Sequence, residues 1–172
     1  LKEHGSTINE IKKDGFKISK KINMFNKGYK GDGASMIFAM GNVMQALSKI
    51  LKGIKPDIIL SGFDIGANFS IVVAGAHLNI PIAHIQGGEL SGSIDESLRH
   101  AMSKFSNFHF VANLDAKRRL IKMGEISKNI YIVGCPSLDA LKNAKEKSLK
   151  ILNNKFKFQF SKKYACVIQH PV

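Results

Sequence analysis

Cysteine and long apolar runs are scarce in this sequence, and each shortage excludes a class of protein. Its two cysteines, Cys135 and Cys166, form no C-x-x-C pair and belong to no His/Cys cluster at metal-binding spacing. This usage is typical of two reduced thiols rather than of a disulfide scaffold or a zinc site. No stretch reaches the roughly 18 uninterrupted apolar residues of a membrane span, and no signal peptide is recognisable. We therefore expect a soluble, cytoplasmic protein with no membrane partner.

Acidic residues are also few, which leaves a formal net charge of +13. The lysines are scattered over the chain and are densest in residues 142–163. Such a charge would attract nucleic acid, but no aromatic-interleaved basic motif or other nucleic-acid signature accompanies it. We expect no nucleic-acid partner, and an anionic small substrate would use only a few of these charges.

The length of 172 residues suffices for one complete α/β domain and part of another. The sequence begins at Leu1 rather than at a methionine and stops at "VIQHPV", inside an apolar run. We expect a fragment of a longer protein.

Short apolar runs alternate with helical patterns along the chain. The runs lack a polar/apolar alternation, so they are predicted to be strands buried on both faces. The strands are expected at 56–61, 80–85, 108–112 and 129–134, and the helices at about 34–52, 66–78, 94–105 and 115–123. Gly124 follows the last helix, where a C-terminal glycine is common. Repeated strand–helix–strand units predict a doubly wound, Rossmann-like parallel sheet.

The second half of the chain suggests a change of domain. We expect a Rossmann-like domain over residues 1–141, whose first strand is missing, and a lysine-rich helix or linker over residues 142–163. Ser137 is a natural N-cap where "GCPSLDAL" opens a helix. Residues 164–172 are expected to begin a second, truncated domain with the strand "YACVIQH".

Ligands of open parallel sheets bind outside the carboxyl ends of the strands. Three segments are expected there: "SGFD" at 61–64, "QGGELSGS" at 86–93 and "QH" at 169–170. The glycine pair Gly87–Gly88 offers backbone amides and little bulk beside a helix N-terminus, which suits a phosphate or a sugar. A glycine pair alone is a weak signal, whereas the loop together with Asp64 and His170 is a stronger one.

The segment "SIDE" has a purely structural interpretation as well. Ser93 and Glu96 fit a capping box, in which the Ser93 side chain accepts from the amide of Glu96 and the carboxylate reaches back. Asp95 would complement the helix dipole, or pair with Arg99 four residues on. The alternative for Asp95 is a catalytic role.

The motifs "PDIILSGFD", "NIPIAHIQGGELSGSIDESLRHAMSK", "GCPSLDAL" and "QHPV" resemble the hydrolysing UDP-N-acetylglucosamine 2-epimerases of sialic acid biosynthesis. That family reads approximately PDxxxVxGDRFE, NIPxxHxxGGExSGxIDxSIRHAxTK and GCPSxD. The resemblance covers essentially the whole sequence, and its most specific part is "GGELSGSIDES".

The resemblance implies a two-domain GT-B-like fold, of which this chain would supply one half. It implies conversion of UDP-N-acetylglucosamine and water to N-acetylmannosamine and UDP, by elimination of UDP across C1 and C2 and hydration of the unsaturated sugar from the opposite face. Such chemistry needs a base for the C2 proton and donors for the leaving diphosphate. No cofactor and no metal are expected, and the family implies a homo-oligomer. A fragment lacking most of the UDP-binding domain is expected to be inactive alone.

The motif match assigns roles residue by residue. Asp64 and Asp95 match proposed acid/base groups, and His170 matches a histidine near the diphosphate. Glu89 is the alternative base, because Gln86 stands where some members have a catalytic glutamate. The remaining residues expected to bind the substrate are Gly87, Gly88, Ser91, Gly92, Ser93 and Arg99.

Two departures keep other functions open. Ile65 stands where the family often has an arginine beside the nucleotide, and a hydrogen bond to a charged group is worth about 1.5 to 3 kcal/mol. The amide of Gln86 cannot act as a general base. A relative with altered chemistry, such as a non-hydrolysing epimerase or a glycosyltransferase, is one alternative, and a degenerate nucleotide-sugar-binding protein is another.

Overall fold

The computed structural model describes residues 7–25, 29–63, 66–143 and 149–157, together with Ala165, Val167 and Ile168. The chain divides into two compact units, Leu1–Val133 and Gly134–Val172.

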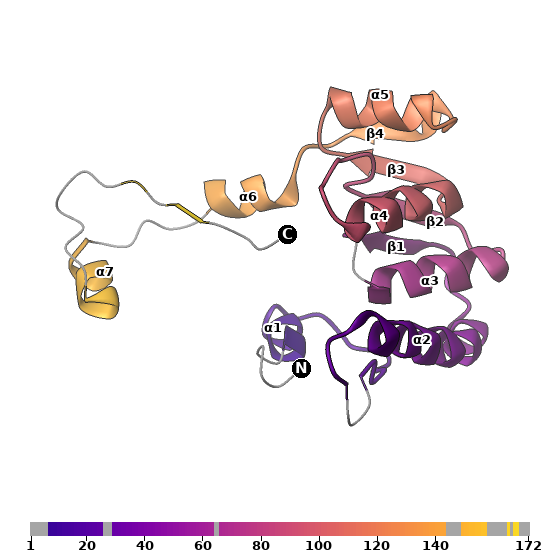
Figure 1. The fold of residues 1–172 in the computed structure, drawn as a ribbon, viewed down its shortest axis with the longest axis horizontal. Coiled ribbons are helices and arrows are strands. Elements are labelled where there is room, and N and C mark those ends of the chain that lie inside the picture. The colour runs from indigo at the N-terminus through magenta and orange to yellow at the C-terminus, as the bar shows by residue number, and fades with distance from the viewer. Residues whose placement is uncertain are drawn as a thin grey trace. The chain divides into compact units, whose positions relative to one another are not determined.

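The first unit is built on a parallel sheet of four strands in the order β1-β2-β3-β4 (Figure 1). The strands are β1 (Ile59–Gly62), β2 (Ile82–Ile85), β3 (Phe108–Val111) and β4 (Ile130–Ile132). Ser61 pairs with His84, and His84 with His109, so these polar residues lie in one row across three strands. All four strands fall within one to three residues of the predicted ranges, and the parallel α/β class is confirmed.

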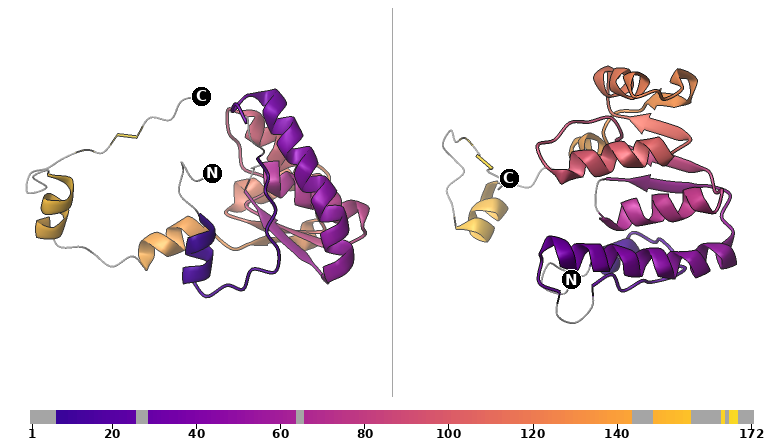
Figure 2. Two further views of the ribbon diagram at one scale, coloured as in Figure 1. Left: turned by 90° about the horizontal axis from the view of Figure 1, so that it is seen from below. Right: turned by 45° about the vertical axis from the view of Figure 1, so that its right-hand side comes forward.

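A helix joins each pair of neighbouring strands. These connecting helices are α3 (Gly66–His77), α4 (Ile94–Phe105) and α5 (Leu114–Lys122), and a short 3-10 helix spans Ser127–Asn129 before β4. Two further helices, α1 (Thr7–Lys13) and α2 (Gly33–Ile54), precede β1. The four long predicted helices are confirmed. Helix α3 lies between α2 and α4, and the right panel of Figure 2 shows these helices as one layer along the sheet. Because the strands follow sequence order, right-handed crossovers place α3, α4 and α5 on the same face.

The core lies between this helix layer and the sheet. Ile59, Ile82 and Val72 of α3 pack with the buried side chains of α2, and Val111, Leu120 and others form a second cluster under α5. The other face of the sheet is more open, since Leu60 is 65% exposed and Tyr131 45%. The expectation that every strand is buried on both faces is therefore wrong for β1 and β4. The apolar runs had suggested a second covering layer that the described residues do not supply.

Helix α2 is long and apolar enough to cross a membrane by length and composition, and it is the one such helix among the described residues. Core helices of globular proteins pass the same test. Val43, Leu47 and Leu51 of α2 are buried in the cluster formed with α3 and the sheet. One face of helix α2 therefore packs in the core of this unit, although only 22% of its apolar window is buried.

The second unit contains α6 (Pro136–Lys142) and α7 (Leu149–Phe156). Helix α6 begins one residue before the predicted cap: Pro136 occupies the first turn, and Cys135 is the N-cap without a side-chain hydrogen bond. Ser137 as the cap is thus wrong, because the fixed φ of proline suits the first helical position. The strand predicted over 164–170 lies outside the described residues except at Ala165, Val167 and Ile168, so the proposed domain boundary stays a prediction.

Candidate active site

The loop over residues 86–93 joins the carboxyl end of β2 to α4, at the edge where ligands of parallel sheets bind. Gln86 has a φ of 60° and Gly88 a φ of 80°, so the chain turns sharply twice within three residues. The amide of Gln86 donates to the carbonyl of Phe110 at 2.8 Å, which continues the pairing of β2 with β3 past the strand end. The loop therefore starts from a fixed point on the sheet.

Gly87 sits directly on two buried polar side chains. A Cβ at this position would lie 2.8 Å from Nδ1 of His84 and 2.9 Å from Oγ of Ser103. Both side chains are fully buried, and the same two atoms are 3.1 Å apart. The backbone at Gly87 approaches this pair more closely than any side chain would allow, which explains the glycine.

Two arginines hold the carbonyls of the next two residues. Nη1 of Arg119, from α5, donates to the carbonyl of Gly88, and Nη1 of Arg99, from α4, donates to the carbonyl of Glu89 at 2.7 Å. Charged donors make hydrogen bonds roughly twice as strong as neutral ones. The backbone from Gly87 to Glu89 is thus fixed by side chains from β2, α4 and α5.

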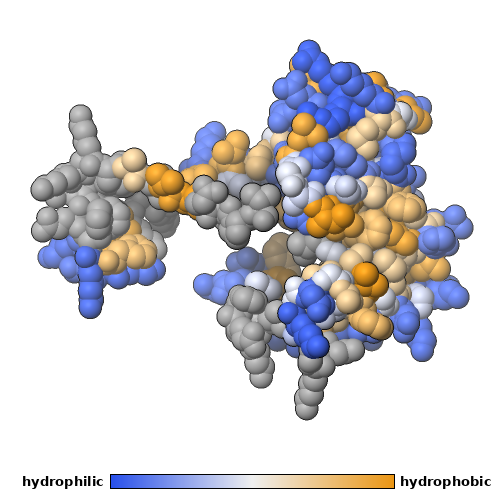
Figure 3. Space-filling view, viewed as in Figure 1, coloured by the Kyte–Doolittle hydropathy of each residue, from blue (hydrophilic) through white to orange (hydrophobic). Residues whose placement is uncertain are grey.

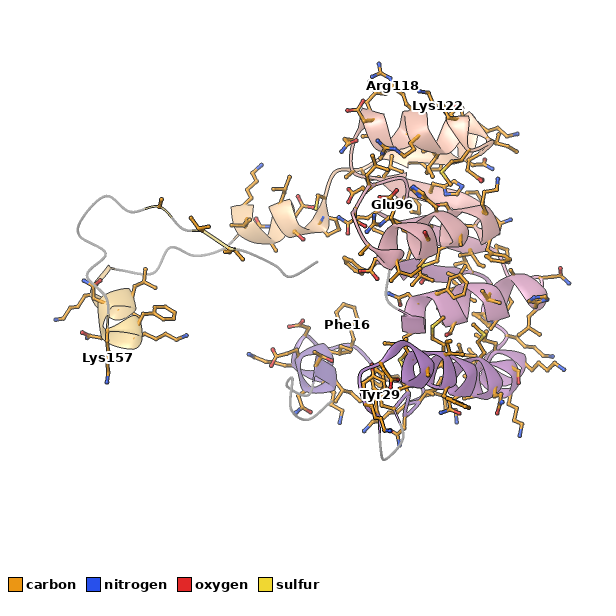
Figure 4. The ribbon with its side chains drawn as sticks, in the orientation of Figure 1. Phe16, Tyr29, Glu96, Arg118, Lys122 and Lys157 are labelled. Carbon is orange, nitrogen blue, oxygen red and sulfur yellow. The ribbon has the colours of Figure 1, made fainter. Side chains whose placement is uncertain are left out.

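Helix α4 begins at the other end of the loop. Ser93 is its N-cap, and Oγ of Ser93 accepts from the amide of Asp95 at 3.3 Å. The carboxylate of Glu96 accepts from the amide of Ser91 at 2.6 Å. Figure 4 shows Glu96 at this end of α4.

The predicted capping box is therefore half correct. Ser93 caps the helix, but its Oγ accepts from Asp95 rather than from Glu96, and Glu96 reaches back two residues beyond the cap. The loop folds over the helix start, which brings the amide of Ser91 nearer to the carboxylate. The ion pair between Asp95 and Arg99 is absent from the described residues, and Arg99 contacts the loop backbone instead.

The three carboxylates of this region differ in what they contact. Glu96 binds the Ser91 amide and lies 3.9 Å from Nε2 of His100. Asp95, half-buried, accepts from Oγ of Ser93 at 3.2 Å, and no cation within the described ranges pairs with it. Among the described residues, the side chain of Glu89, which is also half-buried, forms no hydrogen bond and no ion pair. Asp95 and Glu89 are therefore the carboxylates of this region that no backbone amide and no cation of the described residues engages.

Most of the residues predicted from the sequence lie together here. Gly87, Gly88 and Glu89 form the fixed backbone, Ser91, Gly92 and Ser93 form the exposed turn before α4, and Gln86, Asp95 and Arg99 flank them. Asp64, Ile65 and His170 lie outside the described residues. Their roles stay predictions.

His84, Ser103 and Arg119 were missed as site residues. His84 belongs to the quoted motif, and its position two residues before the loop was a usable signal. Ser103 lies three turns into α4, and Arg119 lies 31 positions after its partner Gly88. No local pattern marks either of these two.

A second polar cluster lies beside the first, one strand further along the sheet. His109 is 1% exposed, and its Nε2 lies 3.3 Å from Oε2 of Glu125, whose Oε1 accepts from Nζ of Lys104 at 2.7 Å. Burial lowers the pKa of His109, and the Glu125 carboxylate offsets this only in part. The cluster joins α4 and β3 to the end of α5.

The described ranges contain no group of three or more His, Cys, Asp or Glu side chains that could hold a metal ion. Hydrophilic side chains gather over α5 (Figure 3), where Arg118 and Lys122 point away from the sheet (Figure 4). A charged helix face of this kind is typical of a solvated surface.

A sequence profile of the family described as UDP-N-acetylglucosamine 2-epimerase matches residues 2–172. The chain is 38% identical over 171 residues to the UDP-N,N'-diacetylbacillosamine 2-epimerase (hydrolyzing) of Legionella pneumophila, covering 98% of this chain. It is 31% identical over 172 residues to the UDP-N-acetylglucosamine 2-epimerase of Neisseria meningitidis serogroup B, covering 100% of this chain. It spans 44% of the length of each relative.

Solved structures show the same fold. The UDP-GlcNAc 2-epimerase of Neisseria meningitidis bound to UDP-GlcNAc matches with a TM-score of 0.67 and 21% identity, over 88% of this chain and 41% of that one. The enzyme of Methanocaldococcus jannaschii in complex with UDP-GlcNAc and UDP matches with a TM-score of 0.70 and 20% identity, over 84% and 41%. These epimerases have a GT-B-like fold, so the expected fold class, a Rossmann-like part of such a fold, is confirmed.

Proposed function

The chain belongs to the UDP-N-acetylglucosamine 2-epimerase family, and on that premise we propose that it forms part of a hydrolysing 2-epimerase of UDP-linked acetamido sugars. The reaction we propose converts UDP-N-acetylglucosamine and water to N-acetylmannosamine and UDP. The observation that carries the proposal is the loop over residues 86–93. It holds two available carboxylates beside a rigid glycine backbone, in a chain 38% identical to a hydrolysing 2-epimerase.

The loop supplies groups that the two chemical steps need. In the elimination, a base takes the C2 proton, the C1–O bond breaks, and its electrons leave with UDP. In the hydration, the oxygen of water adds to C1 and a proton returns to C2 from the opposite face. We assign these proton transfers to Asp64, Asp95 and Glu89, with Gln86 beside them.

The same loop suits the anionic part of the substrate. Gly92 and Ser93 lie at the exposed N-terminus of α4, where the helix dipole and free amides favour a phosphate. Gly87 and Gly88 pack against His84, Ser103 and Ala116, so the backbone beside this exposed turn is held in a fixed place. We assign Ser91, Arg99 and His170 to the same binding surface.

One observation supports UDP-N,N'-diacetylbacillosamine as an alternative substrate. Identity to the relative named for UDP-N,N'-diacetylbacillosamine is 38%, against 31% for the relative named for UDP-N-acetylglucosamine. The complete enzyme should therefore be incubated with each nucleotide sugar in turn, and UDP and free sugar measured. Release of neither free sugar, with an epimerised UDP-sugar or a glycoside as product, would identify a non-hydrolysing epimerase or a glycosyltransferase instead.

The catalytic assignment of Asp95 has a matched control in this chain. Asp115 lies in the first turn of α5 as Asp95 lies in the first turn of α4, and it pairs with Arg118 on an exposed surface. Asp95→Asn should lower product release by about 10²- to 10⁴-fold with little change in melting temperature. Asp115→Asn should leave product release within about two-fold of wild type. An active Asp95→Asn enzyme would remove Asp95 from the mechanism.

A further inference from the structure

A pair of buried polar side chains lies beneath the loop that carries the proposed site. His84 is in β2 and Ser103 is in α4, and both are 0% exposed. Nδ1 of His84 lies 3.1 Å from Oγ of Ser103. Neither side chain reaches the surface where a substrate would bind, so any role in the reaction has to act through other residues.

The contacts of Ser103 fix which atom carries the proton between the two side chains. A serine hydroxyl has one proton to donate and two lone pairs to accept with. Oγ of Ser103 donates to the carbonyl of Arg99 at 3.1 Å, one helical turn earlier. Its contact with His84 must then be one in which it accepts. The imidazole of His84 therefore carries its proton on Nδ1.

The pair supports the loop at two points, at Gly87 directly and at Glu89 through Arg99. Gly87 rests directly on Nδ1 of His84 and on Oγ of Ser103. Arg99, whose carbonyl Ser103 holds, donates from its guanidinium to the carbonyl of Glu89. A change in either side chain should therefore displace Gly87 directly, and should displace Glu89 through Arg99.

We propose that His84, in its Nδ1–H form and bonded to Ser103, is a positioning residue that sets the place of the Gly87–Glu89 backbone for the reaction. This inference rests on the proposed function, since the loop matters to turnover only if substrate binds there. A misplacement of about 1 Å in a reacting group costs on the order of 10²-fold in rate. The imidazole acts at a distance from the reacting atoms and takes no proton from the substrate.

The first test needs no variant and no activity. Nitrogen NMR of the ¹⁵N-histidine-labelled complete protein at neutral pH reports which ring nitrogen carries the proton. The expected result is a proton on Nδ1 of His84. A proton on Nε2 would overturn the inference, because Ser103 would then have to donate to His84 and release the carbonyl of Arg99.

The second test separates the hydrogen bond from packing. The side-chain nitrogen of asparagine lies where Nδ1 of histidine lies, and that of glutamine lies closer to Nε2. If packing alone mattered, His84→Gln would keep the higher kcat, because the volume of glutamine is nearer to that of histidine. The hydrogen bond favours His84→Asn, so we expect its kcat to exceed that of His84→Gln by at least about tenfold, with the larger share of the loss from wild type in kcat rather than KM.

Ser103→Ala removes the acceptor and should also lower kcat and speed hydrogen exchange of the Gly87, Gly88 and Glu89 amides. Ser48→Ala is the control, because Oγ of Ser48 donates to a carbonyl of its own helix α2 at 2.7 Å, remote from the loop. Equal kcat for the two His84 variants, or unchanged amide exchange in Ser103→Ala, would overturn the inference. If the wild-type enzyme releases no sugar, the proposed function fails, while the NMR and exchange results still decide whether His84 positions the loop.

Discussion

Replacing Gly88 with alanine tests how the loop is held. Gly88 has a φ of 80°, and a Cβ there would lie 2.6 Å from the carbonyl oxygen of Ala116 and 3.0 Å from Cγ of Leu120. A non-glycine residue in a sparsely populated backbone region costs about 1 to 3 kcal/mol. Overpacking against a fixed backbone costs about 1 to 3 kcal/mol more. Since the added methyl group causes both effects, the costs add, and we expect Gly88→Ala to lower the free energy of unfolding by about 2 to 6 kcal/mol.

Gly92, in the same loop, is the matched control. A Cβ there meets nothing within 4 Å, and its φ is outside the left-handed region. An alanine at such a site restricts the unfolded chain and stabilises the fold by about 0.4 to 1 kcal/mol. The two variants should therefore move in opposite directions in urea denaturation of the complete protein. A Gly88→Ala variant as stable as wild type, or no less stable than Gly92→Ala, would contradict the close packing of Gly88 against Ala116 and Leu120.

Three further results are expected. Because burial lowers the pKa of His109, the folded chain binds fewer protons than the unfolded chain just below pH about 6.5. The urea midpoint of unfolding should therefore fall as the pH drops from 7 to 5, and a rise over that range would contradict this. Arg119→Met should lower the free energy of unfolding by about 1.5 to 3 kcal/mol, because it removes a charged donor from a carbonyl of the loop, whereas exposed Arg118→Met should change it by less than about 1 kcal/mol. Glu96→Ala should speed hydrogen exchange at the Ser91 amide, and unchanged exchange there would mean that the carboxylate does not hold it.

Much of the fold was readable because its signals are local. Gly124 follows α5 with a φ of 92°, its amide donates to the carbonyl of Ile121 at 2.9 Å, and the amide of Glu125 donates to Leu120 at 3.0 Å. This glycine-ended motif was visible in the sequence and sets the end of the helix. It also places Glu125 beside His109, a consequence that depends on the strand positions and that the sequence did not suggest.

The details of the candidate site were less readable, because they depend on the path of the loop in space. The capping-box pattern identified Ser93 correctly, but the partner of Glu96 follows from the fold of the turn at Ser91. Asp95 and Arg99 have the spacing of a helical ion pair, but the guanidinium of Arg99 donates to the carbonyl of Glu89 in the neighbouring loop. A helical pattern predicts which side chains are near each other on one helix, and not which of them a neighbouring segment will engage.

The order of the strands bears on how the chain acquires its structure. Each strand pairs with the one that precedes it, and the helix between them packs beside at least one of the two. The contacts of each new strand–helix unit are thus made with the unit synthesised just before it. Each pairing joins residues that are 21 to 25 positions apart, such as Ile59 and Ile82, and the entropic cost of closing a loop rises only slowly with its length. The sheet can therefore grow one strand at a time from β1, in the order in which the ribosome delivers the chain.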